Sequence, residues 1–453
     1  MTTKTHSLFS QSVARCRGLR SFSERPQFTL LEQRAGLFRR ATPGFVKPDD
    51  TPIPWIISGF SSSIKLMKRS ASSAAGGERR GEDGSKKPRP NEKNAEGSSK
   101  TEHSTSDKRT DKVEKVLPRK LTGKLSVVLL QLPVESTGAD YKAVNVRNAL
   151  KEVREVVVQK RLVEKAQEVL IMLPEIWNGP YAADAFPNFC EPIPEVGEEI
   201  TEATRSLHEL ASVCRTFASE GSITLMAGSI PEIDKRGRIY NTSVTVCNNR
   251  IICKHRKVHL FDIDIPGKIT FKESETLTAG DRVSIFDRIV AAAPGPKDMM
   301  GVERIRSDKI RFGVGICYDI RFPELSLLMR AEHGAHILCF PAAFNTTTGP
   351  KHWSLCMRAR AIDTQCFVLA CSPARNTTGQ GYQAYGHSIV VSPWGEILAE
   401  LDEKPGKIEL ELDLSEISEA RAGIPIGMQR RKEVYRLVGA QSPTPDVPQL
   451  PGN

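Results

Sequence analysis

Residues 311–324 read RFGVGICYDIRFPE, and within them Cys317 lies where a predicted strand gives way to a predicted helix. The apolar run before the cysteine indicates a buried strand, and the helix is expected over residues 323–333. A side chain at such a turn is held by rigid elements, and backbone N–H groups beside it can face a developing oxyanion. A thiolate there is a strong nucleophile once a nearby cation or base lowers the pKa of the thiol. The alternative is an ordinary buried cysteine, because most of the ten cysteines lie in apolar runs.

Strand and helix patterns alternate on both sides of this turn. Strands are expected at residues 125–132, 171–173, 223–230, 241–247, 251–254, 311–316, 337–340, 367–370 and 407–412, and a hairpin is expected to join 389–392 to 396–400. Further helices are expected at residues 145–170, 200–220 and 352–364. This mixture of strand–helix units and hairpins predicts an α/β fold with a mixed sheet.

Charge and complexity divide the chain near residue 121. The first 120 residues hold 25 Lys and Arg against 13 Asp and Glu, whereas the remainder holds 39 against 41. Residues 67–120 are rich in Ser, Gly, Lys and Glu and poor in large apolar side chains, which predicts a disordered basic linker. We therefore expect one folded domain over residues 121–440 and a C-terminal tail over 441–453. Because that domain is nearly neutral, we expect no nucleic-acid partner, and no apolar run reaches the roughly 18 residues of a membrane helix.

Residues 1–66 form a possible targeting segment. The first 23 residues contain Lys, Arg, Ser and Thr but no Asp or Glu, a composition typical of an organellar transit peptide, mitochondrial or other. Two alternatives fit the same composition: an ordinary tail on a cytoplasmic protein, and translation that starts at Met67.

Two further residues follow predicted strands in a way that suits catalysis. Glu175 ends the apolar run that begins at Ile171, and a carboxylate in such a setting has the raised pKa that a general base requires. Lys257 follows the strand at residues 251–254, where an ammonium group can stabilise an oxyanion and lower the pKa of a thiol. The alternatives are an exposed loop glutamate and a solvated basic run.

Metal and cofactor sites find little support in the sequence. Cys253, His255 and His259 resemble metal ligands, but no matching second set accompanies them. No phosphate-binding glycine loop precedes a predicted helix. We therefore expect neither a metal nor a cofactor.

The order strand–Glu175, strand–Lys257, strand–Cys317 resembles the nitrilase superfamily of carbon–nitrogen hydrolases over about residues 121–438. The resemblance implies a four-layer α-β-β-α sandwich and subunits that pair as homodimers. Several runs are similar to the omega-amidase branch of that superfamily, at residues 173–181, 255–264, 265–274, 344–353, 386–396 and 424–431. The runs IPGKI (265–269) and NTTTGP (345–350) are the more specific to that branch.

The resemblance also implies catalytic roles. Glu175 acts as the base, and Cys317 attacks the amide to form a thioester. Lys257 and the backbone N–H of Tyr318 stabilise the oxyanion. Glu273 matches a second family carboxylate, which orients Lys257 or holds the amide or water.

The implied substrate is a small dicarboxylic acid monoamide, such as 2-oxoglutaramate or 2-oxosuccinamate. Arg321 matches the position that receives the remote carboxylate, a role that suits a planar guanidinium, and a structural salt bridge is the alternative. Tyr181, Tyr318, Phe344 and Thr348 match other substrate-binding positions. Alternative activities are those of a nitrilase, a carbamoyl hydrolase or a deaminated-glutathione amidase. A non-catalytic scaffold that binds anionic partners through the basic tail is the alternative from another class.

Two stretches depart from the family pattern. Extra charged sequence lies at about residues 154–165. An insertion at 289–308 precedes the predicted strand that leads to Cys317. The insertion is expected to form a surface loop, near either the dimer contact or the mouth of the pocket.

Overall fold

The computed structural model describes residues 120–160, 168–216, 222–267, 269–292 and 306–440. The chain divides into two units, Met1–Asp107 and Lys108–Asn453, and every described residue belongs to the second. The predicted targeting segment 1–66, nearly all of the predicted linker 67–120 and the predicted tail 441–453 lie outside the described residues.

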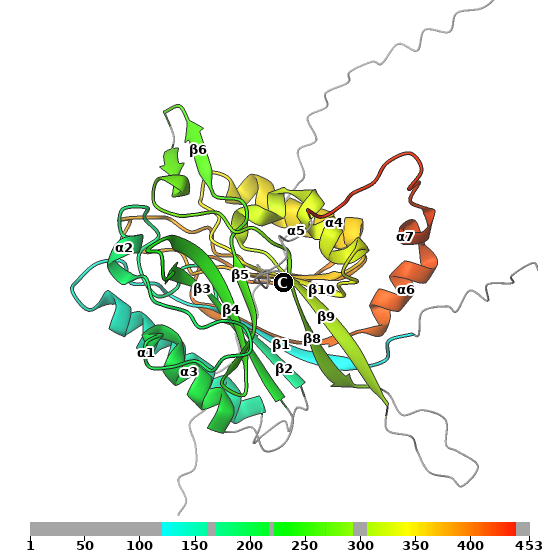
Figure 1. Ribbon diagram of the computed structural model, residues 1–453, viewed down its shortest axis with the longest axis horizontal. Coiled ribbons are helices and arrows are strands. Elements are labelled where there is room, and N and C mark those ends of the chain that lie inside the picture. Colours follow the sequence, from blue (N-terminus) through cyan, green and yellow to red (C-terminus); the bar gives the residue numbers. More distant parts are fainter. Residues whose placement is uncertain (1–119, 161–167, 217–221, 268, 293–305, 441–453) are drawn as a thin grey trace, which may run out of the picture. The chain divides into compact units, whose positions relative to one another are not determined.

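Two six-stranded sheets form the centre of the described unit (Figure 1). The first, in the order β14-β1-β2-β3-β4-β5, consists of β1 (Lys124–Gln131), β2 (Glu168–Met172), β3 (Ser222–Ile233), β4 (Ile239–Cys247), β5 (Arg250–Arg256) and β14 (Gly406–Asp413). The second, in the order β13-β12-β11-β10-β9-β8, consists of β8 (Ser284–Ala291), β9 (Ser307–Val314), β10 (Ile337–Pro341), β11 (Phe367–Cys371), β12 (Ile389–Val391) and β13 (Ile397–Glu400). A separate small hairpin follows β5, formed by β6 (Asp262–Ile265) and β7 (Ile269–Lys272).

The helices connect these strands. They are α1 (Tyr141–Val158), α2 (Phe186–Phe189), α3 (Arg205–Thr216), α4 (Pro323–Ala331), α5 (Gly349–Thr364), α6 (Ser415–Gly423) and α7 (Ile426–Gln429). Two 3-10 turns carry residues of the candidate site, η2 (Glu273–Glu275) and η3 (Cys317–Arg321). Of the helices in the described ranges, none combines the length and the apolar character needed to cross a bilayer.

Strand β1 is covered on both of its faces. Successive side chains of a strand point to opposite faces of the sheet. Val128 and Leu130 pack with α1 and α3, whereas Val127 and Leu129 pack against strands of the second sheet. All four side chains are 1% exposed or less. The nearly continuous apolar run that predicts this strand therefore reflects burial on two sides.

Strand β10 repeats this arrangement in the second sheet. Leu338 and Phe340 pack with α4 and α5, whereas Ile337 and Cys339 pack toward the first sheet. The layers are therefore helix, sheet, sheet and helix, so the predicted four-layer α-β-β-α sandwich is confirmed. The two sheets are held together mainly by the hydrophobic effect, through apolar side chains that alternate along each strand.

The first sheet unites strands from the two ends of the described sequence. Strand β1 pairs in parallel with β2 on one side and antiparallel with β14 on the other. In the second pairing Lys124 lies opposite Asp413, and Gln131 lies opposite Gly406. The predicted strand at residues 407–412 thus completes the sheet that begins with the first predicted strand.

One predicted helix is too long. The helix expected over residues 145–170 begins at Tyr141 and ends at Val158, and Glu168–Met172 forms strand β2. All five residues of β2 are buried, so the strand has no polar face to reveal a period of two. A short apolar run of this kind is ambiguous between helix and strand. The charged stretch at 154–165 continues α1 at its start, and residues 161–167 lie outside the described part.

The surface-loop prediction for residues 289–308 is wrong at both of its ends. Ile289 and Val290 belong to β8, and they pair antiparallel with Lys309 and Asp308 of β9. Residues 293–305, the centre of the insertion, lie outside the described residues. The sequence prediction also omits β8 itself and the β6–β7 hairpin, two elements whose side chains are largely half-buried or exposed.

Candidate active site

Glu175, Lys257 and Cys317 all follow the ends of strands. Glu175 comes after β2 and Lys257 after β5 of the first sheet, and Cys317 comes after β9 of the second. The three side chains are 1%, 0% and 4% exposed, respectively. The alternatives of an exposed loop glutamate and a solvated basic run are therefore wrong.

Cys317 begins the turn η3 in a conformation that is unusual for a residue with a side chain. Its φ angle is 44°, in the left-handed region that favours glycine. Such a backbone costs on the order of 1 kcal/mol and persists only where the surroundings impose it. Two residues earlier, a Cβ atom on Gly315 would meet the Phe340 ring at 2.6 Å, so glycine is required there. The first N–H groups of η3 have no acceptor within the turn and are suited to an oxyanion.

Asp319 fixes this turn against the strand end that carries Lys257. It is fully buried, and its Oδ2 accepts a hydrogen bond from the backbone N–H of Ile316 at 2.9 Å. Its Oδ1 accepts one from the backbone N–H of His259 at 2.9 Å, and the ring nitrogens His259 Nδ1 and His255 Nε2 lie 2.7 and 3.1 Å from its two oxygens. Burial alone would raise the pKa of Asp319, but these partners lower it well below its usual range. Asp319 is therefore an anion that ties the nucleophile turn to both sides of Lys257.

The Lys257 ammonium lies between two buried carboxylates. Its Nζ is 3.0 Å from Glu175 Oε1 and 2.9 Å from Glu273 Oε2. Burial by itself lowers the pKa of Lys257, but the carboxylates of Glu175 and Glu273 raise it well above its ordinary value. The lysine is therefore charged, and its charge is compensated where an unpaired ion would cost several kcal/mol.

Glu273 supports Lys257 from the hairpin side of the site. It begins η2, is fully buried, and accepts the backbone N–H of Phe261 on Oε2 at 2.7 Å. The Tyr181 hydroxyl donates to its Oε1 at 2.8 Å. Glu273 is thus held rigidly in contact with Lys257, and its role as the second carboxylate of the reaction stays a prediction.

Glu175 engages one carboxylate oxygen in these contacts. Its Oε1 accepts hydrogen bonds from Lys257 at 3.0 Å and from Asn241 Nδ2 at 2.9 Å. Its Oε2 is buried and accepts no hydrogen bond from the described residues. Burial raises the pKa of Glu175, Lys257 lowers it and Glu273 raises it, and the result lies above the ordinary value. The residue therefore presents a buried acceptor with the proton affinity of a general base.

The Cys317 sulfur is protonated in the resting site. Burial raises the pKa of the thiol well above its ordinary value, and the Glu175 carboxylate raises it further. Lys257 and the backbone N–H of Ala343 act in the opposite direction and lower the pKa of the thiol, because they stabilise a thiolate. A thiol with so high a pKa needs a base before it can act as a nucleophile, and Glu175 is the carboxylate whose charge raises that pKa.

Aromatic rings line one side of this charged centre. The ring centroid of Tyr181 lies 4.6 Å from that of Tyr382 and 5.6 Å from that of Phe271. Burial raises the pKa of Tyr382 well above its usual range, and the nearby Cys317 and Glu175 raise it further. Both tyrosines are therefore neutral phenols. The hydroxyl of Tyr181 contacts the two carboxylates, and its predicted contact with substrate stays a prediction.

Two of the other predicted substrate-binding residues, Phe344 and Tyr318, lie near Arg321, whereas Thr348 contacts Asn345. The guanidinium carbon of Arg321 lies 4.5 Å from the ring centroid of Phe344 and 5.8 Å from that of Tyr318. Thr348 precedes α5, and its hydroxyl donates to Asn345 Oδ1 at 3.0 Å. Within the part of the chain that the structure describes, Arg321 forms no ion pair with an Asp or Glu, so the salt-bridge alternative finds no partner there.

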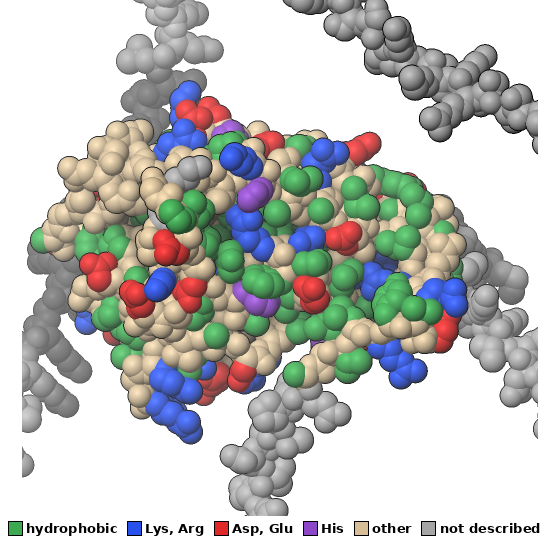
Figure 2. Space-filling view, turned by 90° about the horizontal axis from the view of Figure 1, so that it is seen from above, with side chains coloured by type: hydrophobic (Ala, Val, Ile, Leu, Met, Phe, Trp, Pro, Cys, Tyr) green, Lys and Arg blue, Asp and Glu red, His purple; other side chains and the backbone are tan. Residues whose placement is uncertain are grey.

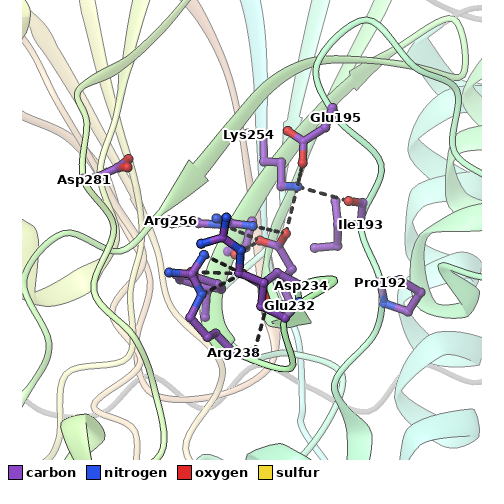
Figure 3. Close-up of polar contacts among 12 residues, drawn as sticks. Pro192, Ile193, Glu195, Glu232, Asp234, Arg238, Lys254, Arg256 and Asp281 are labelled. Carbon is purple, nitrogen blue, oxygen red and sulfur yellow. Dashed lines mark hydrogen bonds and ion pairs between the residues drawn. The ribbon is translucent and has the colours of Figure 1, made fainter. Parts of the chain in front are cut away.

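An ion-pair network outside the site fixes the end of β5 (Figure 3). Glu232 of β3 lies 2.6 Å from Arg256 Nη2 and 2.8 Å from Lys254 Nζ. Arg256 also lies 3.8 Å over the ring of Tyr240. Because Arg256 immediately precedes Lys257, this network anchors the strand end from which the lysine enters the site.

The three residues that resembled metal ligands have other partners. His255 and His259 contact Asp319, while Cys253 lies between the sheets, where burial raises its pKa to about 12. Across the described ranges, no group of three or more His, Cys, Asp or Glu side chains has the arrangement of a metal site.

Sequence reasoning overlooks several residues of the site. Asn241 lies within a buried strand, and Tyr382 lies in a loop without a regular pattern, so neither position carries a signal of its own. Asp319 could have been recognised more easily, because it lies two residues after Cys317 within residues 311–324. His352, the fourth overlooked residue, lies in the first turn of α5 against Arg321.

Comparisons with known proteins identify the family and the relatives of this chain. The profile of the carbon–nitrogen hydrolase family matches residues 129–422. An Arabidopsis thaliana protein named "Omega-amidase, chloroplastic" is 42% identical over 72% of this chain and 77% of its own. The Homo sapiens protein "Omega-amidase NIT2" is 40% identical over 69% of this chain and 96% of its own. The crystal structure of Saccharomyces cerevisiae Nit3, a member of branch 10 of the nitrilase superfamily, is 38% identical with a TM-score of 0.55, and covers 69% of this chain and 98% of its own.

The family match includes every residue of the buried centre. Glu175, Lys257, Glu273 and Cys317 all lie within residues 129–422, a range that covers more than half of the chain. The same range includes both central sheets apart from the first residues of β1. This chain therefore belongs to the carbon–nitrogen hydrolase family, the nitrilase superfamily that its sequence resembles.

Proposed function

We propose that the protein is an omega-amidase, which hydrolyses the terminal amide of 2-oxoglutaramate or 2-oxosuccinamate to the 2-oxo dicarboxylate and ammonia. The observation that carries the proposal is a guanidinium, that of Arg321, without an acidic partner among the described residues and in the same turn as Cys317. The buried centre suits amide hydrolysis, and the guanidinium suits a carboxylate remote from the amide. The two relatives named as omega-amidases, 42% and 40% identical, support the same assignment.

The reaction begins with acylation of Cys317. Glu175 accepts the thiol proton as the sulfur attacks the amide carbon, so that a C–S bond forms and the carbonyl oxygen becomes an oxyanion. Lys257 and the backbone N–H of Tyr318 stabilise that charge. Glu175 then gives its proton to the amide nitrogen, the C–N bond breaks, and ammonia leaves a thioester.

Water completes the cycle by hydrolysing the thioester. Glu175 accepts a proton from water, whose oxygen attacks the acyl carbon, and the carboxylic acid departs as the proton returns to the Cys317 sulfur. Lys257 keeps its charge in both halves, because the neighbouring carboxylates raise its pKa. One ammonium can thus stabilise the two oxyanions in turn.

The alternative activities of the superfamily share this reaction centre. A nitrilase, a carbamoyl hydrolase or a deaminated-glutathione amidase would use the same glutamate, lysine and cysteine and would differ in the pocket. A guanidinium held on the Phe344 ring favours a short substrate with a second carboxylate over a neutral nitrile.

Replacement of the nucleophile tests both the mechanism and the substrate. In the full-length protein, Cys317→Ala should reduce ammonia release from 2-oxoglutaramate roughly a thousandfold or more, because no thioester can form. The assay should include glutamine, a nitrile and an N-carbamoyl amino acid, and Cys190→Ala, a half-buried cysteine, is the matched control. A wild-type preference for another compound would end the omega-amidase assignment. A folded wild-type protein that hydrolyses none of the compounds would contradict the catalytic interpretation.

The pH profile tests Glu175 as the base. Its raised pKa places the acid limb of kcat/KM above the ordinary glutamate value of about 4.3, because only the deprotonated form accepts the thiol proton. Asn241→Leu removes a donor that stabilises the carboxylate form, so the limb should move to higher pH by about one unit.

A neighbouring variant serves as the control for that shift. Thr242→Val removes a buried hydroxyl on the same strand that donates to Glu232 at 2.6 Å, so the limb should stay in place. An acid limb that moves to lower pH in Asn241→Leu, or one that moves equally in both variants, would contradict the assignment of Glu175.

We also propose that two copies of the chain pair through α5 and its neighbours. Leu355 and Ile362 lie seven residues apart on one face of α5 and are 66% and 52% exposed. Trp394, 42% exposed, precedes Gly395, and a Cβ atom on Gly395 would meet Ile362 at 2.7 Å, so the turn that carries Trp394 lies against this face of α5. Figure 2 shows hydrophobic side chains at several places on the face that it presents, more of them in the right half of the view. Exposed apolar residues that adjoin one another in this way are typical of a protein interface.

A charge in this patch should separate the proposed dimer. Ile362→Glu is expected to shift the sedimentation coefficient from that of a dimer to that of a monomer, because a carboxylate would be buried without a partner. Val196→Glu, at a site that is 56% exposed outside the patch, should leave the dimer intact. A monomeric wild-type protein at micromolar concentration would refute the proposed pairing.

We propose an organellar location for the full chain. The support is the absence of Asp and Glu from the first 23 residues and the similarity to a relative named as chloroplastic. Residues 1–66 fused to a fluorescent protein should carry it into an organelle, and the same fusion with Arg15, Arg17 and Arg20 changed to alanine should not enter. Diffuse cytoplasmic fluorescence of the unaltered fusion would contradict the proposal.

A further inference from the structure

The guanidinium of Arg321 is held by a histidine rather than by an acid. Arg321 Nη1 lies 2.9 Å from His352 Nδ1, and the guanidinium carbon lies 4.5 Å over the Phe344 ring. Within the described part of the chain, the remaining side-chain contact of Arg321 is with the more distant ring of Tyr318, whose centroid lies 5.8 Å from the guanidinium carbon. A planar group fixed by one ring below it and one acceptor beside it retains further N–H donors for a ligand.

The chemistry of the pair defines the state of His352. An arginine side chain is always protonated and can only donate, so the hydrogen bond requires a lone pair on Nδ1. His352 is therefore neutral and carries its proton on Nε2. Its surroundings agree with this state, because burial, Arg321 and Lys351 all lower the pKa of His352.

Helix α5 fixes both ends of the arginine. Arg360 of α5 donates from Nε to the carbonyl oxygen of Ile320 at 2.8 Å and from Nη2 to that of Arg321 at 3.4 Å. His352 is fixed in turn by the first turn of α5, where its backbone N–H donates to the Thr348 carbonyl at 2.9 Å. The backbone of Arg321 is therefore held by one α5 side chain, and the end of its side chain by another.

A long side chain that is already ordered has less rotamer entropy to lose when it binds a ligand. A side chain as long as that of arginine is among those that lose the most rotamer freedom when they become ordered. A guanidinium that is fixed before the substrate arrives therefore gives tighter binding of the remote carboxylate. The contact between His352 and Arg321 should therefore affect the binding of the substrate carboxylate and not the reaction at the amide, which takes place at Cys317 and Lys257.

We propose that His352 is a positioning residue that fixes Arg321 for the substrate carboxylate and thereby determines the preference for carboxylated amides. The inference rests on the proposed omega-amidase function and deepens it. According to this proposal, the preference for carboxylated amides depends on the hydrogen bond between His352 of α5 and Arg321 of η3 as well as on Arg321 itself.

Two amides of equal chain length isolate this contribution. Succinamic acid and butanamide differ in the carboxylate alone, so the ratio of their kcat/KM values measures carboxylate recognition. In the full-length protein, His352→Leu should raise KM for succinamic acid roughly tenfold with little change in kcat, the size of one lost hydrogen bond to a charged group. The kinetics with butanamide should not change.

A conservative variant and a neighbouring variant complete the design. In His352→Gln the amide oxygen can accept from Arg321, so this variant should restore much of the preference for succinamic acid. Lys351→Met removes the adjacent positive charge while leaving the Arg321 contact in place, and it should behave as the wild type. Thermal unfolding midpoints of the variants should match, which separates loss of positioning from loss of structure.

Each outcome decides the inference. A preference for succinamic acid that is unchanged in His352→Leu overturns it, as does a His352→Gln variant that behaves like His352→Leu. An equal loss of kcat with both amides would indicate a structural role and overturn it as well. If the wild-type protein itself does not prefer the carboxylated amide, the proposed function fails together with the inference, and that result differs from all the others.

Discussion

A buried ammonium between two buried carboxylates is the interaction on which the candidate site depends. Lys257 carries one positive charge, and the carboxyl groups of Glu175 and Glu273 can carry two negative charges, while all three side chains are at most 1% exposed. Excess negative charge in such surroundings is expensive, so the site gains from binding a proton. This surplus is one reason why the pKa of Glu175 and that of Cys317 both lie above their ordinary values. A proton can then pass between sulfur and carboxylate, which is the step that the proposed reaction repeats.

The packing of the two sheets sets the geometry of this centre. Glu175 and Lys257 belong to loops of the first sheet, whereas Cys317 belongs to a loop of the second. The placement of Glu175 relative to Cys317 therefore depends on apolar contacts between the sheets, such as those of Leu129 and Cys339. Asp319 adds a polar tie at the same junction, because it bonds to residues on both sides of Lys257 from within the nucleophile turn. The relative positions of Glu175, Lys257 and Cys317 therefore depend on the packing of the whole sandwich.

The sequence predicts the parts of this arrangement that have a local pattern. Buried strands produce continuous apolar runs, and the residues that follow them, Glu175, Lys257 and Cys317, can be recognised by position. The same feature hides the start of β2, whose first three residues are assigned to the preceding helix, because five buried residues in a row have no period. Contacts between distant residues are harder to predict. Asn241 meets a glutamate 66 positions away and His352 an arginine 31 positions away, and neither residue has a neighbouring signal that indicates its partner.

The pairing of β14 with β1 governs when the protein can acquire this site. Strand β1 emerges from the ribosome early, yet one of its edges finds its partner only after residue 413 has been synthesised. Until then β1 exposes unpaired backbone groups and apolar side chains, a combination that promotes aggregation. Contacts of such long sequence separation also slow folding, because a very large loop must close before they form. The first sheet therefore stays incomplete on this side of β1 until nearly the whole of the described sequence has been synthesised.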